Sequence, residues 1–361
     1  MFFKETYANK RVFLTGHTGF KGSWLLASLY LSGAIVKGYA LPPSPEQNLF
    51  PSIQGENLCE SFFGNILINE TLEKEILDFE PDFIFHLAAQ PIVRLSYEHP
   101  LETFNVNAMG TANVLNACRK LSKPCIVILV TTDKVYQNHE WHYAYRETDR
   151  LGGYDPYSAS KACAELIIDS FRHSFFNKKE NDQHGKRILV ARAGNVIGGG
   201  DWAKDRIIPD IIRALGKEKP VIVRNPLSVR PWQHVLESVY AYLLMGKIFA
   251  NESANLSTTF NFGPEVTDCL PVKQVVEYAI SIWGSGSYET ITSQNGVHEA
   301  GLLKLDISRA AAELNWKPTW TAKESISKTI NWYKNFDGNN AFELMKKDIS
   351  SFSDRLTPAN A

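Results

Sequence analysis

The sequence has almost no net charge and no long apolar run. Its 38 lysines and arginines are matched by 39 aspartates and glutamates, which leaves a formal charge of -1 on 361 residues. No overall positive field therefore attracts nucleic acid or an anionic membrane, and any phosphate group must be bound by a local site. No stretch approaches the roughly 18 apolar residues that a membrane-spanning helix needs, and the charged start of the chain does not match a signal peptide.

Cysteine and metal-ligand patterns are equally sparse. The five cysteines, an odd number, are at positions 59, 118, 125, 163 and 269 and are not closely paired. Most lie in apolar segments, so we expect reduced and buried thiols. The nine histidines are scattered without ligand spacing, and we expect no metal. Together these absences predict a cytoplasmic protein that binds neither nucleic acid nor membrane.

The chain does contain a regular alternation of apolar strands and helices. The strand-like runs are residues 12–14, 35–39, 83–85, 125–130 and 188–191, and the helix-like segments include 72–79, 101–121 and 157–176. This alternation predicts an α/β fold of the Rossmann type, built on a doubly wound parallel sheet. The alternation ends after Ala191, where a Gly-rich stretch and short Pro-bounded strands predict a smaller α/β domain that binds the substrate.

Three glycines lie where the first strand gives way to the first helix. Gly16, Gly19 and Gly22 have the spacing Gly-x-x-Gly-x-x-Gly. Glycine lets a backbone approach a pyrophosphate closely, and a helix N-terminus offers free amides to the anion. The pattern differs from the commoner Gly-x-Gly-x-x-Gly and is weak alone. Its position near the N-terminus, followed by a second apolar strand, predicts a dinucleotide site.

Tyr157 and Lys161 form a second motif, Tyr-x-x-x-Lys, on a predicted helix. Residues four apart share one face of a helix. A phenol with a pKa near ~10 is a poor base at neutral pH, whereas a neighbouring ammonium ion lowers that pKa. A lone Tyr-x-x-x-Lys is common by chance, but here it predicts a proton-transfer pair in which Lys161 lowers the pKa of Tyr157.

These two motifs, together with a strand that ends in Thr131-Thr132-Asp133-Lys134, resemble the extended short-chain dehydrogenase/reductase superfamily over nearly the whole chain. Further matches to its nucleotide-sugar modifying members are the segments 86–90 and 191–198 and Asn107. Within that group, the segments 198–210 and 230–235 resemble the CDP-D-glucose 4,6-dehydratases.

The resemblance implies a reaction, a cofactor and a domain layout. The reaction is the dehydration of CDP-glucose to CDP-4-dehydro-6-deoxy-glucose in deoxysugar biosynthesis of the O-antigen type. In such enzymes NAD takes a hydride from C4 and returns it at C6 after water is lost across C5 and C6. The implied domains are an NAD-binding domain of residues 1–191 plus about 231–258, and a nucleotide-sugar domain of about 192–230 plus 259–361. In relatives, two helices of one subunit pack against the same two helices of another as a four-helix bundle, so we expect a homodimer or homotetramer.

The resemblance also implies roles for the catalytic residues. Tyr157 removes the proton of the hexose 4-hydroxyl, Lys161 holds the nicotinamide ribose, and Thr132 bonds the same sugar oxygen. Elimination needs an acid for the leaving hydroxyl, and Asp133 can serve if its pKa is raised. The base for C5 stays open. Lys134 can act if desolvation depresses its pKa from about 10.4; alternatively, it orients a water or Asp133.

Two sets of binding residues follow from position and resemblance. The expected cofactor contacts are Gly16, His17, Gly19, Phe20, Lys21, Gly22, Asn65, Ile66, Ala88, Ala89, Gln90, Asn107, Tyr157 and Lys161. The expected substrate contacts are Gln90, Thr132, Asn195, Arg206, Arg230 and His298. NAD rests on the resemblance, because the acidic residue expected about 20 positions after the glycines is missing and no arginine replaces it for a 2′-phosphate. His17 and Lys21 are candidates for the ribose or phosphate contacts.

Two other functions remain open. A nucleotide-sugar 4-epimerase, or a dehydratase for another nucleotide, also uses Tyr157 and Lys161, although an epimerase needs no acid for a 6-hydroxyl and hence no Asp133. A non-catalytic protein that senses the dinucleotide could dispense with Tyr157, Lys161 and Thr132, and all three are present.

Overall fold

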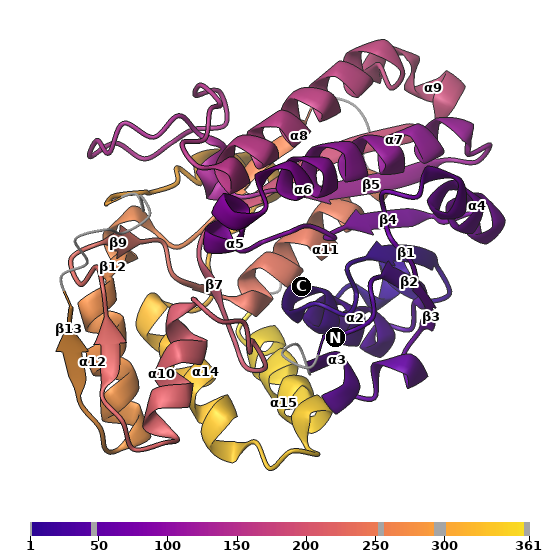
Figure 1. Cartoon of the computed structure of the whole chain (residues 1–361). Coiled ribbons are helices and arrows are strands. Elements are labelled where there is room, and N and C mark those ends of the chain that lie inside the picture. The colour runs from indigo at the N-terminus through magenta and orange to yellow at the C-terminus, as the bar shows by residue number, and fades with distance from the viewer. Residues whose placement is uncertain (1, 45–48, 252–255, 292–300, 357–361) are drawn as a thin grey trace.

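A computed structural model describes residues 2–44, 49–251, 256–291 and 301–356, and a seven-stranded sheet lies at its centre. The strand order is β11-β6-β5-β4-β1-β2-β3, and all neighbouring strands are parallel (Figure 1). The strands are β1 (Arg11–Thr15), β2 (Ile35–Ala40), β3 (Glu60–Phe63), β4 (Phe83–His86), β5 (Cys125–Val130), β6 (Lys186–Ala193) and β11 (Thr259–Phe262). The prediction of a Rossmann-type sheet is confirmed, and the chain order reverses at β1, where such sheets bind ligands.

Helices cover both faces of this sheet, because alternate side chains of each strand point to opposite faces. Phe13 of β1 packs with α4 (Asn69–Phe79), α7 (Gly110–Lys120) and α8 (Pro156–Ser174). Its neighbours Val12 and Leu14 pack on the other face with α2 (Phe20–Leu31) and α11 (Val235–Asn251). Shorter helices are α1 (Lys4–Tyr7), α3 (Leu49–Ser52), α5 (Val93–Glu98), α6 (Pro100–Phe104) and α9 (Asn181–His184). Both layers are therefore held to the sheet by buried apolar side chains.

A smaller part of the molecule lies beyond the carboxyl ends of the strands, at the lower left of Figure 1. It contains the strand pairs β7 (Val196–Ile197) with β10 (Gln233–His234), β8 (Val221–Val223) with β13 (Tyr288–Thr290), and β9 (Val229–Arg230) with β12 (Leu270–Pro271). Its helices are α10 (Ile207–Leu215), α12 (Val272–Trp283) and α14 (Ala322–Asn335). Two further helices near the C-terminus are α13 (Ser308–Leu314) and α15 (Ala341–Ser353). Helix α15 contacts α2 of the larger part.

The division of the chain into two domains remains a prediction, and one strand departs from the expected boundaries. The sequence placed the residues from 259 onward with the smaller domain, whereas β11 pairs with β6 from Thr259 to Phe262. Phe260 and Phe262 are fully buried in the core of the larger part. The returning chain therefore adds α11 and then a further strand to the large sheet.

Among the described residues, no helix is long and apolar enough to cross a membrane. All five cysteines are free thiols. Cys118 and Cys125 are buried as expected, whereas Cys59, Cys163 and Cys269 are partly exposed. The expectation of buried thiols is thus correct for Cys118 and Cys125 and wrong for the other three.

Candidate active site

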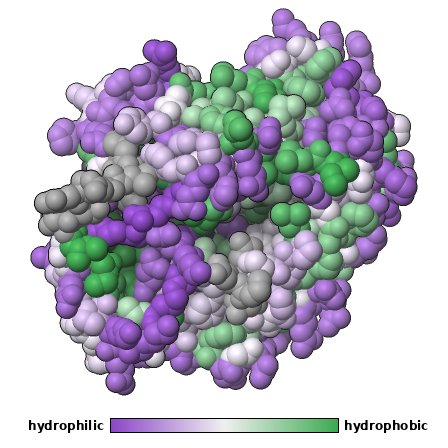
Figure 2. Space-filling model, viewed as in Figure 1, coloured by the Kyte–Doolittle hydropathy of each residue, from purple (hydrophilic) through white to green (hydrophobic). Residues whose placement is uncertain are grey.

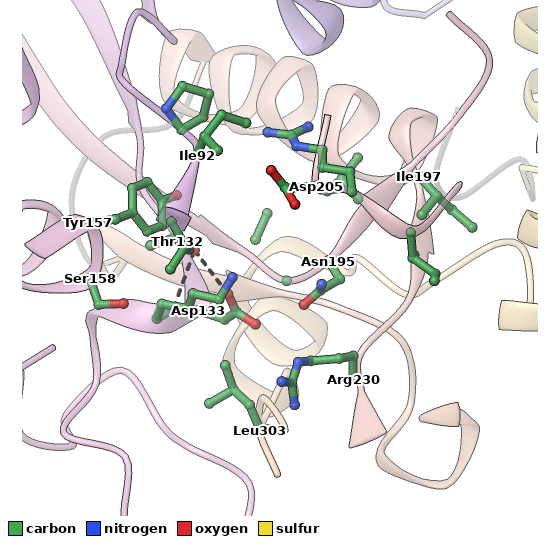
Figure 3. A pocket seen from close by; sticks show the side chains of 18 of the residues that line it. Ile92, Thr132, Asp133, Tyr157, Ser158, Asn195, Ile197, Asp205, Arg230 and Leu303 are labelled. Carbon is green, nitrogen blue, oxygen red and sulfur yellow. Dashed lines mark hydrogen bonds between the residues drawn. The ribbon is translucent and has the colours of Figure 1, made fainter. Parts of the chain in front are cut away.

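A cavity of about 620 Å³ lies between the carboxyl ends of the strands and the smaller part of the molecule. Its wall includes the end of β5, the first two turns of α8, the segment 193–198 and the loop before α10. Figure 3 shows Thr132, Asp133, Tyr157, Asn195 and Arg230 arranged around it. Figure 2 shows hydrophilic side chains beside a hollow near the middle of the face drawn in Figure 1. The volume suits a small-molecule ligand.

The start of α8 positions Tyr157 and Lys161. Asp155 caps the helix: its Oδ1 accepts a hydrogen bond from the Ser158 backbone N–H at 2.9 Å, and its Oδ2 accepts one from the Ser158 hydroxyl at 2.6 Å. Pro156 occupies the first helical position, where its missing N–H costs nothing. Tyr157 and Lys161 are 8% and 6% exposed, and both line the cavity.

The turn after β5 brings an acid and a base next to this helix. Asp133 begins a short 3-10 turn, and its Oδ1 accepts a hydrogen bond from the Thr132 hydroxyl at 3.0 Å. Its Oδ2 is buried and has no hydrogen-bond partner among the described residues. Lys134 Nζ lies 5.9 Å from the centre of the Tyr157 ring. Four potential proton-transfer groups thus line one cavity.

Burial shifts the pKa values of Asp133 and Lys134 in opposite directions. Desolvation raises the pKa of Asp133, although the neighbouring Lys134 opposes that rise. Desolvation lowers the pKa of Lys134, and Asp133 in turn opposes that fall. A raised carboxyl pKa favours a protonated acid, and a lowered amine pKa favours a neutral base.

Tyr157 differs from the expectation drawn from the sequence. Burial raises the pKa of its phenol to about 12, and a hydrogen bond with Thr132 opposes the rise. Lys161 donates a hydrogen bond to the Val130 carbonyl oxygen at 3.3 Å, and burial lowers its own pKa to about 8. The pKa of Tyr157 is thus raised overall, because desolvation of the phenol is the largest effect, and the lowering by Lys161 stays a prediction.

The glycine-rich turn has the close packing that a dinucleotide site needs. Gly16 adopts φ +76°, and a Cβ there would lie 2.7 Å from the Ala88 backbone nitrogen. A Cβ on Gly22 would lie 1.9 Å from the Gly16 carbonyl oxygen. Gly19 caps α2, whose first turn includes Phe20 and Lys21. Larger residues would thus push the turn away from the end of the sheet, so the residues present fit a bound dinucleotide.

The other expected cofactor residues take different positions. His17 is fully buried and its Nε2 lies 2.6 Å from the Ser61 hydroxyl oxygen. Burial lowers the pKa of His17 to about 4, so this imidazole is neutral. Lys21 lines the cavity, and burial with the nearby Arg206 and Lys161 lowers its pKa to about 7. Of the two candidates for replacing the missing acid, Lys21 faces the cavity and His17 packs between β2 and β3.

The expected adenine-side and loop residues are mostly engaged within the protein. Asn65 Oδ1 accepts a hydrogen bond from the Leu67 N–H at 2.9 Å, and Ile66 is 5% exposed. Asn107 Oδ1 accepts a hydrogen bond from the Gln90 N–H at 2.9 Å, which anchors the loop that begins at Ala88 and Ala89. The Gln90 side chain bonds Ile92 and Thr103. Gln90 therefore shapes its own loop in this structure and does not line the cavity, although Ala89 does.

Four of the six expected substrate residues, Thr132, Asn195, Arg206 and Arg230, line the cavity. Asn195 Oδ1 is buried without a hydrogen-bond partner among the described residues. Arg206 Nη1 donates to Asp201 Oδ2 at 3.0 Å, and Arg230 Nη1 donates to the Val229 carbonyl oxygen at 3.0 Å. Arg230 is 8% exposed. Of the other two expected residues, Gln90 does not line the cavity, and His298 lies outside the described residues.

Two groups of charged residues near the site were not predicted. Glu165 of α8, one turn beyond Lys161, accepts a hydrogen bond from the Thr131 hydroxyl at 2.6 Å and pairs with Arg192. The helical spacing from Lys161 is a signal that could have identified Glu165. Arg94 and Arg224 both line the cavity, and no sequence pattern connects them. Among the described residues, no cluster of three or more His, Cys, Asp or Glu is arranged to hold a metal ion.

Comparisons with known proteins agree with this geometry. A family model described as GDP-mannose 4,6 dehydratase matches residues 13–329. The chain is 45% identical to a CDP-glucose 4,6-dehydratase of Salmonella typhimurium over 98% of this chain and 99% of that protein. It resembles the structure of a dTDP-glucose 4,6-dehydratase from Bacillus anthracis in complex with NAD, with TM-score 0.75, 22% identity and coverage of 92% and 99%. It also resembles a UDP-glucose 4-epimerase from Thermotoga maritima, with TM-score 0.75, 21% identity and coverage of 90% and 98%.

Proposed function

The chain belongs to the GDP-mannose 4,6 dehydratase family, and we propose that it converts CDP-D-glucose to CDP-4-dehydro-6-deoxy-D-glucose with NAD as cofactor. The observation that carries this proposal is that Asp133, Lys134, Tyr157 and Lys161 all line one cavity. A dehydratase needs an acid and a base for elimination in addition to the residues that oxidise C4. The 45% identity to a CDP-glucose 4,6-dehydratase over 98% of the chain supports CDP-glucose as the substrate.

The cofactor site consists of the glycine turn, the N-terminus of α2 and the start of α8. NAD, when bound, supplies the hydride acceptor for C4 and the hydride donor for C6. The close-packed Gly16 and Gly22 allow the pyrophosphate to approach the α2 amides. Lys161 at the cavity wall would hold the nicotinamide ribose.

Tyr157 is the residue that we assign to the first proton transfer. It takes the proton of the 4-hydroxyl, and the Thr132 hydroxyl bonds the same sugar oxygen. The phenol cannot lose its proton readily by itself, since burial holds its pKa at about 12. Hydrogen bonding by Thr132 and the charge of Arg206 both lower that pKa. Proton transfer therefore depends on groups that the cavity brings around the phenol, not on Tyr157 alone.

Asp133 and Lys134 are the residues that we assign to the elimination. Asp133 protonates the leaving 6-hydroxyl, for which its unpartnered Oδ2 is available. Lys134 removes the C5 proton and returns a proton to C5 when C6 is reduced, and its lowered pKa increases the fraction of neutral amine. Asn195, Arg206 and Arg230 hold the sugar nucleotide, since guanidinium groups bind phosphate oxygens in paired geometry.

Mass spectrometry of separate incubations tests the proposed function. Purified protein with catalytic NAD is mixed with CDP-glucose, dTDP-glucose, GDP-mannose or UDP-glucose. Loss of one water from CDP-glucose is the expected result. Loss of water from another substrate alone would change the assigned nucleotide of the substrate. Epimers have the same mass, so samples without a mass change are examined by proton magnetic resonance, and inversion at C4 would make the protein an epimerase. No reaction with any of the four, despite bound NAD, would favour a sensing role.

We also propose a cytoplasmic homo-oligomer. Apolar side chains are exposed along α6, α8 and the π-helix Asn105–Met109 between α6 and α7: Leu101 is 78%, Leu166 60% and Met109 50% exposed. Figure 2 shows hydrophobic residues in the region of α8. Exposed apolar patches of this kind are typical of subunit contacts. Sedimentation velocity distinguishes a dimer or tetramer from a monomer, and Leu166→Glu should shift the protein toward the monomer.

A further inference from the structure

A carboxylate bridges two arginines on one wall of the cavity. Asp205 lies in the loop before α10, Arg94 lies on α5 of the larger part, and Arg224 follows β8 of the smaller part. Arg94 Nε is 3.5 Å from Asp205 Oδ1, and Arg224 Nη1 and Nη2 are each 3.2 Å from the same oxygen. Figure 3 shows Asp205 apart from Thr132 and Asp133, on a different wall of the cavity. This contact joins segments that are far apart in the sequence.

The geometry of the contact leaves both arginines poorly satisfied. All three nitrogen atoms converge on one oxygen, so Arg224 does not form the two parallel bonds that a guanidinium makes with a carboxylate or phosphate. Arg94 Nε is buried yet has no hydrogen-bond partner among the described residues. An anion with more oxygen atoms than Asp205 offers would therefore satisfy these donors better.

Asp205 is also easily displaced. Its side chain is 38% exposed, and ion pairs at such positions contribute little stability. Its backbone has φ +60°, a left-handed conformation that suits a loop residue but not a helix or strand. A small change in this loop can move the carboxylate without disturbing a regular element.

The charges that line the cavity show how Asp205 could affect the binding of a negatively charged ligand. The lining carries seven basic side chains, namely Lys21, Arg94, Lys134, Lys161, Arg206, Arg224 and Arg230. It carries six acidic ones, namely Asp133, Glu140, Asp155, Asp201, Asp205 and Asp210. A nucleoside diphosphate brings further negative charge into this nearly neutral site, so carboxylates of the lining that are paired with arginines compete with the diphosphate for those arginines.

We propose that the Asp205 carboxylate occupies the position of a phosphate group. When the substrate binds, its diphosphate displaces this carboxylate and binds Arg94 and Arg224. The inference rests on the proposed function, because the diphosphate is that of a nucleotide sugar. Arg94 belongs to the larger part and Arg224 to the smaller part, so a phosphate held by both connects the two sides of the cavity. Asp205 weakens binding by competing for these guanidinium groups, and it keeps them paired when no ligand is bound.

Calorimetric titration of Asp205→Asn tests this competition. Asparagine keeps the shape of the side chain and tolerates the left-handed backbone, so the substitution removes the charge alone. CDP and inorganic pyrophosphate should each bind about 5-fold more tightly, since exposed ion pairs contribute up to about that factor. Cytidine has no phosphate, and its affinity should not change. Glycine tolerates the same backbone, so Asp205→Gly serves as a second variant and should show the same pattern.

Further variants separate competition from a structural effect. Arg94→Gln should weaken CDP binding, and the gain from Asp205→Asn should shrink when both changes are combined. Asp78→Asn is the matched control, because Asp78 pairs with Lys74 at 2.8 Å on the exposed surface of α4. It should leave CDP affinity unchanged. Equal or weaker CDP binding by both Asp205 variants would overturn the proposal. Failure of the wild type to dehydrate CDP-glucose would instead count against the proposed function.

Discussion

At the scale of single residues, neighbouring side chains in the cavity have two different chemical roles, oxidation and elimination. Thr132 and Tyr157 lie where a sugar hydroxyl is to be oxidised, whereas Asp133 and Lys134 carry opposite pKa shifts from the same cause, burial. Environments that move the pKa values of neighbouring groups in different directions allow one to act as an acid and the other as a base. The proposed acid and the proposed base can therefore be tested by separate variants.

Asp133→Asn tests the acid. The amide cannot donate the proton that the leaving hydroxyl requires, so kcat for dehydration should fall by about 100-fold or more, as for loss of a general acid. The side chain keeps its size, and the affinity for CDP should change by less than about 3-fold. Steady-state kinetics with calorimetric titration of CDP provides both values. A kcat near that of the wild type would exclude Asp133 as the acid.

Lys134→Met tests the base. A methionine retains the apolar stem but cannot accept a proton, so the exchange of the C5 proton with deuterated water should be lost together with dehydration. Proton magnetic resonance of the recovered nucleotide sugar measures that exchange. If Lys134 only orients a water or Asp133, exchange should persist at a reduced rate, and dehydration at the wild-type rate would end any direct role.

At the scale of elements, α11 connects the large sheet with the C-terminal helices through one buried acid. Glu237 is fully buried, and its Oε1 accepts hydrogen bonds from the backbone N–H groups of Thr319 at 3.0 Å and Trp320 at 2.7 Å. Burial raises the pKa of Glu237 from 4.5 to about 8. The chain that precedes α14 is therefore attached to a carboxyl group that is neutral at pH 7.

The stability of this attachment should depend on pH. The pKa of Glu237 is higher in the folded protein than in the unfolded chain, so its contribution is full below pH 4.5 and is lost as pH rises through about 8. The Tm should therefore fall between pH 6 and pH 9, and Glu237→Gln should reduce that fall. Differential scanning calorimetry across this range measures both. An equal fall in the wild type and in Glu237→Gln would show that another group is responsible.

The elements also separate what local sequence predicts from what it cannot. Strands such as β5 are continuous apolar runs, and α8 begins at Asp155-Pro156, so both follow from local patterns. β11 was assigned to the other domain because the resemblance placed the returning chain there, and four residues after a polar loop carry no sign of which sheet they join. The raised pKa of Tyr157 was missed for a related reason: sequence shows that Lys161 is near but not how completely the phenol is buried.

At the scale of the whole molecule, the cavity is assembled from segments that the sequence does not connect. Tyr157 and Lys161 could be paired in advance because they share a helix, whereas Arg94, Asp205 and Arg224 lie in three separate segments of the chain. A single charged residue in a loop is most often a solvated surface group, so local patterns give no reason to choose these three. Only the three-dimensional fold brings these three residues together.

Three buried histidines make the whole fold sensitive to acid. Burial lowers the pKa of His17 to about 4 and those of His86 and His234 to about 3, each from 6.5. Each contribution is full above pH 6.5 and is lost as pH falls through the lowered pKa, because the unfolded chain then binds more protons. The free energy of unfolding should decline from pH 7 to pH 5, as urea titrations at several pH values can measure. A constant value over that range would contradict the assignment of neutral buried histidines.

The order of the strands has a consequence for synthesis on the ribosome. The first six strands along the chain that belong to the large sheet are complete by Ala193, but α11, which covers one face of β5 and β6, begins only at Val235. Ile126, Ile128 and Leu189 pack in the same core as α11. Until that helix leaves the exit tunnel, the nascent chain presents this apolar face to the surrounding solution. Transient exposure of this kind favours aggregation, so we expect the half-made protein to be a client of ribosome-associated chaperones.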